Sequence, residues 1–196
     1  NKEGERFGIT FADISTGEFF TTSIENESKL FGEIEKYNPA EIIVPLSFFE
    51  SELVKSIKDK GYNVSSFDDR FFWAEKSINT LKEHFNVLNL EGFGIDEKDA
   101  AVTSSGALLS YLKETQMNTL SHIDSIHKYS VDDYMILDSS TQRNLELLKN
   151  IKDGTTRGTL FEVINKTVTS MGARKLKKWL LRPLLDIKRI EKRLDA

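Results

Sequence analysis

Residues 13–17, Asp-Ile-Ser-Thr-Gly, are the stretch whose residue types and spacing come nearest to a catalytic motif. A carboxylate at the end of a strand can hold a divalent metal ion, and a Ser-Thr-Gly turn can hold a phosphate group. Metal chemistry needs further carboxylates, and the candidates Glu41, Asp68 and Asp69 stand at no spacing that singles them out. The same residue types are expected in a hairpin turn. The turn is therefore the favoured interpretation of Asp13, and a metal-dependent nuclease is the alternative.

The histidines and the glycine pair near the C-terminal end offer no second site. His122 and His127 do not have the i, i+4 spacing of a helical metal pair, and no Cys is present to complete one. We interpret these two residues and His84 as ordinary surface or partly buried histidines. Gly154 and Gly158 flank only Thr-Thr-Arg, which is too sparse for a phosphate loop and predicts a turn. The sequence thus predicts no catalytic, cofactor-binding or metal-ligating residue.

The elements that must position Asp13 form a β-rich front part. Alternating apolar residues predict strands over residues 7–14 and 18–24, joined by the turn that Asp13 opens. The pattern then predicts, in order, a helix over 30–37, a strand over 41–45, a helix capped by Ser47 and a strand over 62–67. This order predicts an α/β layer fold with a mixed sheet and covering helices.

After residue 70 the pattern becomes helical. Ser77 is predicted to cap one helix, and Asp96 or Asp99 to open a longer one. Residues 118–131 are polar and are predicted to be the linker between two domains. A short apolar segment, residues 135–138, then leads into an all-helical remainder.

The last quarter of the chain is dense in signals that start and stop helices. Ser170 is predicted to cap a helix that ends before Pro183, because proline lacks an N–H and restricts the residue before it. Asp186 is predicted to cap the next helix, which reaches Ala196 without a stop signal. No Met opens the sequence, so we expect a piece of a longer chain.

Charge divides the chain into an acidic front and a basic end. Residues 1–144 have a net charge of −11 and residues 145–196 one of +7. The basic end allows a stand-alone nucleic-acid-binding module, but a solvated or interdomain face is favoured. Trp73 and Trp179 are predicted to be core or interface aromatics rather than platforms for bases. No apolar run is long enough for a membrane span, and the absence of Cys agrees with a cytoplasmic protein.

Several ordered segments resemble one family. LDSSTQRNLELLKN (residues 137–150) and GTLFEVINKTVTSMGARKLKKWLLRPL (158–184) are similar to the opening of the core, or lever, domain of MutS proteins, which are DNA mismatch repair ATPases. Upstream, FADISTGEF, NPAEIIVP, LEGFGI and GALLSYLKETQ are similar to the connector domain of that family. The family signature T-x-M-G-x-R-x-L-x-x-W-L-x-x-P-L is matched at Thr169, Met171, Gly172, Arg174, Leu176, Trp179, Leu180, Pro183 and Leu184.

The resemblance implies a ribonuclease H-like connector fold without catalytic carboxylates over residues 1–125, followed by the truncated helical start of the core domain over residues 126–196. It implies a non-catalytic part that couples the mismatch-binding and ATPase domains and contributes to docking MutL. ATP and Mg²⁺ belong to the full-length family, as do contact with mismatched DNA and a homodimer. We also expect exposed apolar surface on the truncated helices. A ribonuclease H-like nuclease and a nucleic-acid-binding helical module remain the alternatives.

Overall fold

The chain forms two compact units. The computed structural model describes residues 2–3, 6–115, 120–135, 137 and 139–195. The first unit contains the described residues up to Phe31 and from Tyr37 to Ser130, and the second contains residues 32–36 and those from Val131 onward. The first is mixed α/β and the second is mostly helical, which confirms the predicted fold class.

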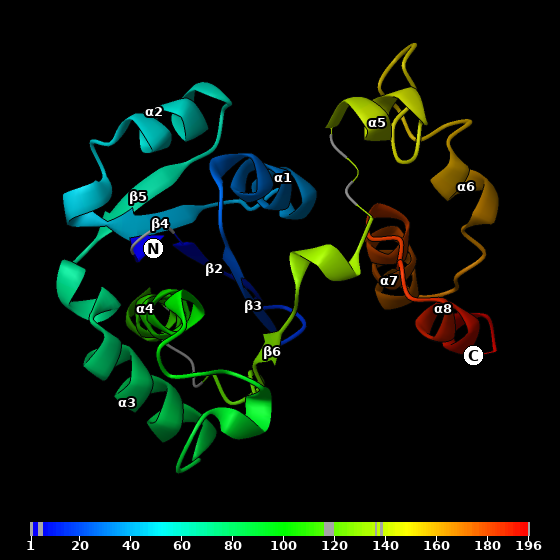
Figure 1. The fold of residues 1–196 in the computed structure, drawn as a ribbon. Coiled ribbons are helices and arrows are strands. Elements are labelled where there is room, and N and C mark those ends of the chain that lie inside the picture. Colours follow the sequence, from blue (N-terminus) through cyan, green and yellow to red (C-terminus); the bar gives the residue numbers. More distant parts are fainter. Residues whose placement is uncertain (1, 4–5, 116–119, 136, 138, 196) are drawn as a thin grey trace. The chain divides into compact units, whose positions relative to one another are not determined.

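The front of the chain alternates short strands and helices (Figure 1). Its strands are β1 (Lys2–Glu3), β2 (Arg6–Asp13), β3 (Glu18–Ile24), β4 (Ile42–Pro45), β5 (Val64–Phe67) and β6 (His127–Lys128). Its α-helices are α1 (Glu27–Tyr37), α2 (Glu52–Asp59), α3 (Ala74–Phe85) and α4 (Ala100–Thr115). Short 3₁₀ turns η1 (Leu46–Phe48), η2 (Asp69–Phe72) and η3 (Glu91–Phe93) join some of them.

The predicted mixed sheet is divided into two hydrogen-bonded sheets. One has the order β1-β2-β3-β6, and the other contains only β4 and β5, which run parallel. β2 and β3 form the predicted antiparallel hairpin, in register from Phe7 opposite Ile24 to Asp13 opposite Glu18. β6 lies parallel to β3, so the four-stranded sheet is itself mixed.

Helix α4 is buried on nearly every side of its first three turns. Its Val102 and Leu109 belong to a core that includes Phe19 of β3 and Leu81 of α3. Thr103, Ser104, Ser105 and Ser110 are buried as well. The hydroxyls of Ser104 and Ser105 donate to the carbonyl oxygen of Ala101 (3.0 and 2.6 Å). This helix therefore joins the hairpin to α3.

Two of the predicted helix caps in this unit are wrong. Ser51, not Ser47, caps α2, because a 3₁₀ turn occupies the residues after β4. Ser77 lies inside the first turn of α3, buried, with its hydroxyl donating to the carbonyl oxygen of Phe71 (3.1 Å). Asp99 is confirmed as a residue that opens α4, since its carboxylate accepts from the N–H of Ala101 (3.0 Å).

The stretch predicted as a linker contributes to the core. Leu120, Ile123 and Ile126 are 5%, 1% and 2% exposed and pack in the same apolar cluster as Phe19. The linker prediction is therefore wrong for this part of residues 118–131, while residues 118 and 119 lie outside the described residues. The first unit continues to Ser130. The domain division at residues 125 and 126 stays a prediction.

The second unit carries the remaining helices. They are η4 (Val131–Asp133), α5 (Ser139–Asn144), α6 (Leu160–Ile164), α7 (Ser170–Leu181) and α8 (Ile187–Leu194). Asp186 caps α8 as predicted, and Gly154 and Gly158 adopt positive φ in the loop before α6. Of the apolar segment 135–138, Ile136 and Asp138 lie outside the described residues, as does Ala196.

Among the helices of the described ranges, none has both the length and the apolar composition required to cross a bilayer.

Candidate functional site

Asp13 is part of a hairpin turn. Its carboxylate accepts hydrogen bonds from the N–H and the hydroxyl of Ser15 (2.9 and 2.6 Å). Its carbonyl oxygen accepts from the N–H of Gly17 (2.9 Å), and the positive φ of Gly17 closes the turn. The side chain thus closes the loop onto itself, and the turn interpretation is confirmed.

Each of the other candidate carboxylates binds a different protein group. Glu41 accepts from the hydroxyls of Ser65 (2.5 Å) and Tyr111 (2.9 Å). Asp69 accepts from Ser47 (2.8 Å), and the guanidinium of Arg70 holds the pKa of Asp68 below its ordinary value. Over the part of the chain that the structure covers, no three His, Asp or Glu residues are grouped so as to hold a metal ion. The structure does not bring the proposed nuclease carboxylates together.

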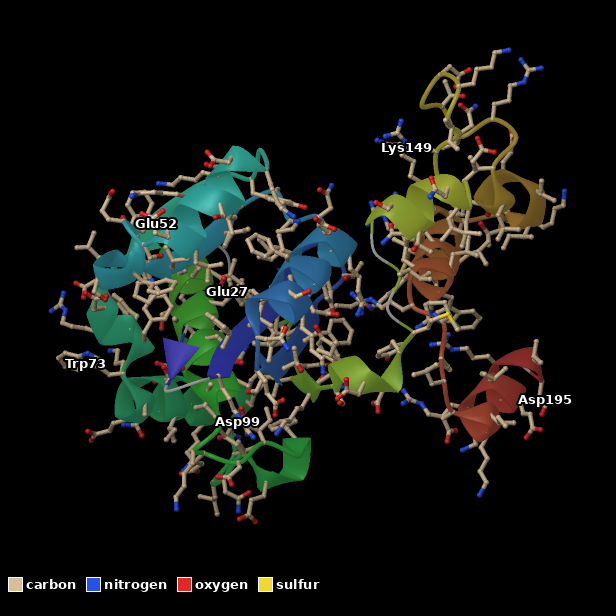
Figure 2. The ribbon with its side chains drawn as sticks, turned by 45° about the horizontal axis from the view of Figure 1, so that its top comes forward. Glu27, Glu52, Trp73, Asp99, Lys149 and Asp195 are labelled. Carbon is tan, nitrogen blue, oxygen red and sulfur yellow. The ribbon has the colours of Figure 1, made fainter. Side chains whose placement is uncertain are left out.

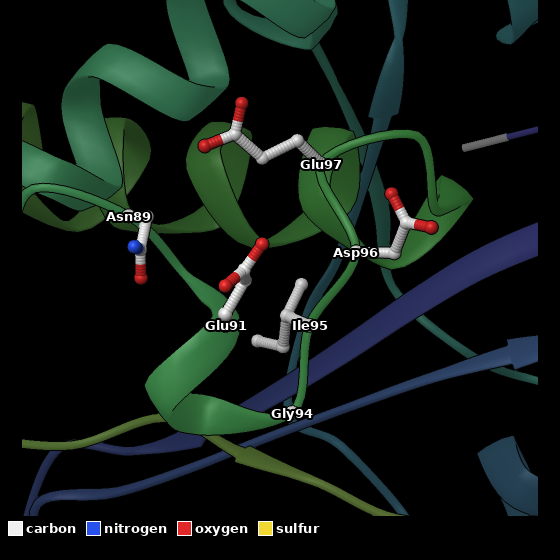
Figure 3. A pocket seen from close by; sticks show the side chains of 6 residues that line it. All are labelled: Asn89, Glu91, Gly94, Ile95, Asp96 and Glu97. Atoms are coloured by element: carbon white, nitrogen blue, oxygen red, sulfur yellow. The ribbon is translucent and has the colours of Figure 1, made fainter.

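A pocket of about 460 Å³ lies beside η3 (Figure 3). It is lined by Asn89, Glu91, Gly94, Ile95, Asp96 and Glu97. Glu97 forms an ion pair with Lys82 (2.6 Å), and Asp96 accepts from the N–H of Lys98 (2.9 Å). A lining whose only charges are carboxylates repels phosphate groups, so this pocket does not suit a nucleotide or a nucleic acid backbone.

His84 and His127 contact other residues of the first unit. The Nε2 of His84 lies 2.9 Å from the carbonyl oxygen of Ile123, which ties α3 to the segment after α4. Burial lowers the pKa of His84, so the neutral ring is favoured. The ring of His127 lies 5.6 Å from that of Phe20, across the β3–β6 pair. These contacts agree with the interpretation of both residues as ordinary histidines.

The two tryptophans differ in their surroundings. Trp73 is 62% exposed at the start of α3 and points outward (Figure 2), so it is not a core residue, and the alternative of an interface aromatic stays a prediction. Trp179 of α7 is half-buried, with the guanidinium of Arg193 4.9 Å and the ammonium of Lys175 5.8 Å from its ring. A cation over an aromatic face is stabilising. Trp179 therefore fastens α8 to α7.

The turn between α7 and α8 is joined to the segment that opens the second unit. The N–H of Met135 donates to the carbonyl oxygen of Pro183 (2.8 Å), and the N–H of Leu185 donates to that of Asp133 (3.3 Å). These bonds form an antiparallel bridge between Tyr134 and Leu184, which we call the Tyr134–Leu184 bridge. Because Pro183 cannot donate, it suits a position where only its carbonyl oxygen is used. The bridge fixes the direction in which α8 leaves α7.

Arg189 of α8 supports this bridge from the side. Its guanidinium lies 3.3 Å from the carboxylate of Asp133 and 5.9 Å from the ring centre of Tyr134. Sequence reasoning did not identify Tyr134, Arg189 or Arg193, because their partners are distant in sequence. The local signal was limited to Arg189 and Arg193 being four residues apart on one predicted helix.

The contacts described for the nine signature residues are helix caps and packing contacts. Thr169 caps α7 by accepting from the N–H of Gly172 (3.0 Å), and Ser170, which was predicted as the cap, is the first helical residue. Leu184 is buried in the Tyr134–Leu184 bridge, whereas Met171 and Arg174 are exposed. The other members, Leu176, Trp179, Leu180 and Pro183, are half-buried.

Replacing Thr169 by Ala is expected to destabilise the second unit by about 1 kcal/mol, because the N–H of Gly172 loses its acceptor. The measurement is hydrogen exchange of the amides of α7. Ser170→Ala is the control, since an exposed substitution next to the cap changes stability by less than about 0.5 kcal/mol. Equal effects of both substitutions would show that Thr169 is not the cap.

The second unit also exposes apolar surface, as expected. Eleven of the fifteen large apolar side chains that are exposed among the described residues lie between Met135 and Leu194. Three of its basic residues contribute to internal structure: Arg182 is buried, Arg189 pairs with Asp133, and Arg193 covers Trp179. Its surface is therefore less uniformly basic than the sequence indicates.

Comparison with known proteins identifies the family. Residues 1–124 match the family model described as MutS domain II, and residues 140–196 match the one described as MutS domain III. The whole chain is 46% identical to a DNA mismatch repair protein MutS of Methanosarcina acetivorans, and covers 22% of its length. In 98% of its length it is 42% identical to a MutS of Lachnoclostridium phytofermentans, of which it covers 21%.

The chain thus spans about a fifth of the length of the curated relatives it matches. The two matched regions follow one another in the order expected for the connector and core segments. On these matches and on the signature residues of α7, the chain belongs to the MutS family, as its domain II and the start of its domain III.

Proposed function

We propose that this chain is a non-catalytic coupling part of a mismatch-repair MutS, joining a mismatch-binding domain to an ATPase domain. The observation that carries the proposal is the division of the chain into two compact units. The first contains an apolar core that includes α3, α4 and the hairpin, and the second contains the Tyr134–Leu184 bridge. Packed units of this kind move as bodies rather than deform continuously.

The proposed mechanism is a rigid-body movement of one unit relative to the other about residues 131–134, the part of the predicted region 118–134 that follows the first unit. The signature residues support it, because the contacts of Thr169, Trp179 and Leu184 determine the direction and stability of helices. The candidate carboxylates of the first unit support it as well, since each binds a partner within the fold. ATP, Mg²⁺ and mismatched DNA are proposed to bind other parts of the full-length protein, which acts as a homodimer in the cytoplasm.

The proposed partner of the first unit is MutL. The test is a titration of the chain with MutL by calorimetry, alongside ATPase and DNA-binding assays. We expect binding of MutL, no ATP hydrolysis, and only weak binding of DNA that decreases as salt is raised. Tight binding that selects mismatched DNA would overturn the proposal and favour the nucleic-acid-binding module.

A second titration assigns the MutL contact to one unit. A piece that ends at Ser130 keeps β6 and Ile126, whereas one that ends at residue 125 loses both and exposes part of the core. The cut after Ser130 is therefore the better division for the experiment. If the piece 1–130 is folded by circular dichroism and does not bind MutL, the docking role of the first unit is wrong.

A further inference from the structure

The last strand of the first unit, β6, is very short. β6 consists of His127 and Lys128, placed opposite Phe20 and Thr21 of β3. One further hydrogen bond, from the N–H of Tyr129 to the carbonyl oxygen of Thr21 (3.0 Å), continues the pairing. A strand of this length at the edge of a sheet is marginally stable by itself. Side-chain contacts must therefore contribute to holding it.

One side-chain contact that holds β6 comes from Asp99, at the start of α4. Its carboxylate accepts from the N–H of Ala101 (3.0 Å), from the ammonium of Lys128 (2.6 Å) and from the hydroxyl of Ser23. We call Ser23, Asp99 and Lys128 the Asp99 cluster (Figure 2 labels Asp99). The side chains of Asp99 and Lys128 are only 14% and 31% exposed, so water screens their attraction less than that of a surface pair.

The hydrogen bonds of the cluster also fix the charge of Asp99. Burial alone raises the pKa of its carboxyl, but the hydrogen bonds from Lys128, Ser23 and the N–H of Ala101 outweigh burial and hold the pKa below its ordinary value. Asp99 is therefore ionised at neutral pH and attracts Lys128.

Two of the elements that the Asp99 cluster joins, β3 and α4, are also held together by other hydrogen bonds. The side chain of Thr21 is fully buried, and its hydroxyl lies 3.0 Å from that of Ser105 and 2.9 Å from that of Thr10. It also lies 3.3 Å from the carbonyl oxygen of Ala101. These contacts tie β2, β3 and α4 together independently of Asp99. Of the elements that the Asp99 cluster joins, β6 has the shortest backbone pairing, and the rings of His127 and Tyr129 add contacts with Phe20 (5.6 and 6.5 Å between ring centres).

We infer that Asp99 is a positioning residue, which holds Lys128 and thereby fixes where and in which direction the chain leaves the first unit. The inference rests on the proposed function in one respect, that the coupling of the two units matters to the protein. With the Asp99 cluster intact, β6 is part of the first unit up to Ser130. With the cluster broken, residues 127–130 lengthen the connection that enters the second unit at Val131, and the coupling through this connection weakens.

The first measurement is hydrogen exchange of the Tyr129 amide, which reports the pairing of β6 with β3. Lys128→Met and Asp99→Asn are each expected to speed its exchange about tenfold, whereas the amides between β2 and β3 are unchanged. Asn retains an oxygen for the N–H of Ala101, so this variant keeps the cap of α4. Lys128→Arg keeps the charge and is expected to restore exchange to near the wild-type rate.

Lys82→Met is the matched control. It removes the ion pair of Lys82 with Glu97, which has the same length (2.6 Å) and a similarly exposed lysine (27%) but a more exposed carboxylate (39%), and in which neither residue belongs to β6. Its Tyr129 amide is expected to exchange at the wild-type rate. Equal acceleration by Lys82→Met and Lys128→Met would show that general loss of stability, and not the Asp99 cluster, controls β6.

The second measurement reports the coupling directly. The chain contains no Cys, so one Cys at the exposed Glu83 of α3 and one at the exposed Lys192 of α8 can carry a pair of fluorophores. The distribution of single-molecule transfer efficiencies is expected to broaden in Lys128→Met and Asp99→Asn, and to stay as in the wild type in Lys82→Met. A distribution that is unchanged in all three variants would overturn the inference.

These measurements are made without MutL, DNA or ATP, so their result is independent of the proposed function. A broadened distribution together with no binding of MutL by the wild-type chain would leave the role of Asp99 established and the docking role wrong. An unchanged distribution together with MutL binding would leave the proposed function standing and the inference wrong.

Discussion

Replacing Gly8 by Ala is expected to destabilise the first unit by about 3 kcal/mol or more. A Cβ on Gly8 would lie 1.8 Å from the carbonyl oxygen of Ala100 and 2.4 Å from its carbon. Overpacking a core typically costs about 1–3 kcal/mol, and here the obstructing atoms belong to the backbone of α4, which cannot rotate away. β2 or α4 must shift, and every contact of α4 with the hairpin weakens as a result.

The measurement is equilibrium unfolding in urea, followed by the fluorescence of Trp73 after Trp179 is changed to Phe. Gly92→Ala is the control in the same unit, because a Cβ there meets no atom within 4 Å and its φ is ordinary. It is expected to stabilise by about 0.4–1 kcal/mol through the unfolded chain. A Gly8→Ala variant as stable as the wild type would contradict the close packing of α4 on β2.

In α4, the local cap could be predicted from the sequence, whereas the long-range contacts could not. Asp99 was one of the two residues predicted to open α4, with Asp96, because capping depends on neighbours within three residues. That Ser104 and Ser105 are buried was not predicted, since their polar side chains indicate a surface. Each lies within hydrogen-bonding distance of Thr10, more than ninety residues earlier in the chain. A partner so distant leaves no signal in the local pattern.

The misplaced caps have a different cause. Where several Ser and Thr residues precede a helix, composition does not decide which one adopts the extended backbone that an N-cap requires. Thr169, for example, has φ −109° and ψ 151° and is the cap, whereas Ser170 beside it is already helical. The element was predicted correctly and its first residue was not, as is usual for helix ends.

The linker prediction failed because a regular spacing was overlooked. Leu120, Ile123 and Ile126 recur every three residues within a polar stretch, and all three are buried. The Tyr134–Leu184 bridge could not be read from the sequence at all, because it joins backbone groups fifty residues apart. Pro183 was predicted as a helix stop and Leu184 was named only through the family signature, and the structure shows the bridge to which both belong.

Leu184→Ala is expected to destabilise the second unit by about 2–4 kcal/mol and to leave the first unit unchanged. Leu184 is 7% exposed, and truncating a buried Leu removes apolar contacts and leaves a cavity. The backbone bonds of the Tyr134–Leu184 bridge remain possible, so the loss reports packing beneath the bridge. Because Leu184 belongs to the second unit and the apolar cluster of α3 and α4 contains only residues of the first, the effect is not expected to spread to α3 and α4.

The chain itself supplies the two reporters for this experiment. It contains two tryptophans, Trp73 in the first unit and Trp179 in the second. Urea unfolding is followed in Trp73→Phe and Trp179→Phe backgrounds, and only the Trp179 transition is expected to shift to lower urea. Leu185→Ala is the control, since its side chain is 53% exposed and its loss costs less than about 0.5 kcal/mol. If both transitions shift together, the chain unfolds as one cooperative body, and the proposed movement of two units loses its basis.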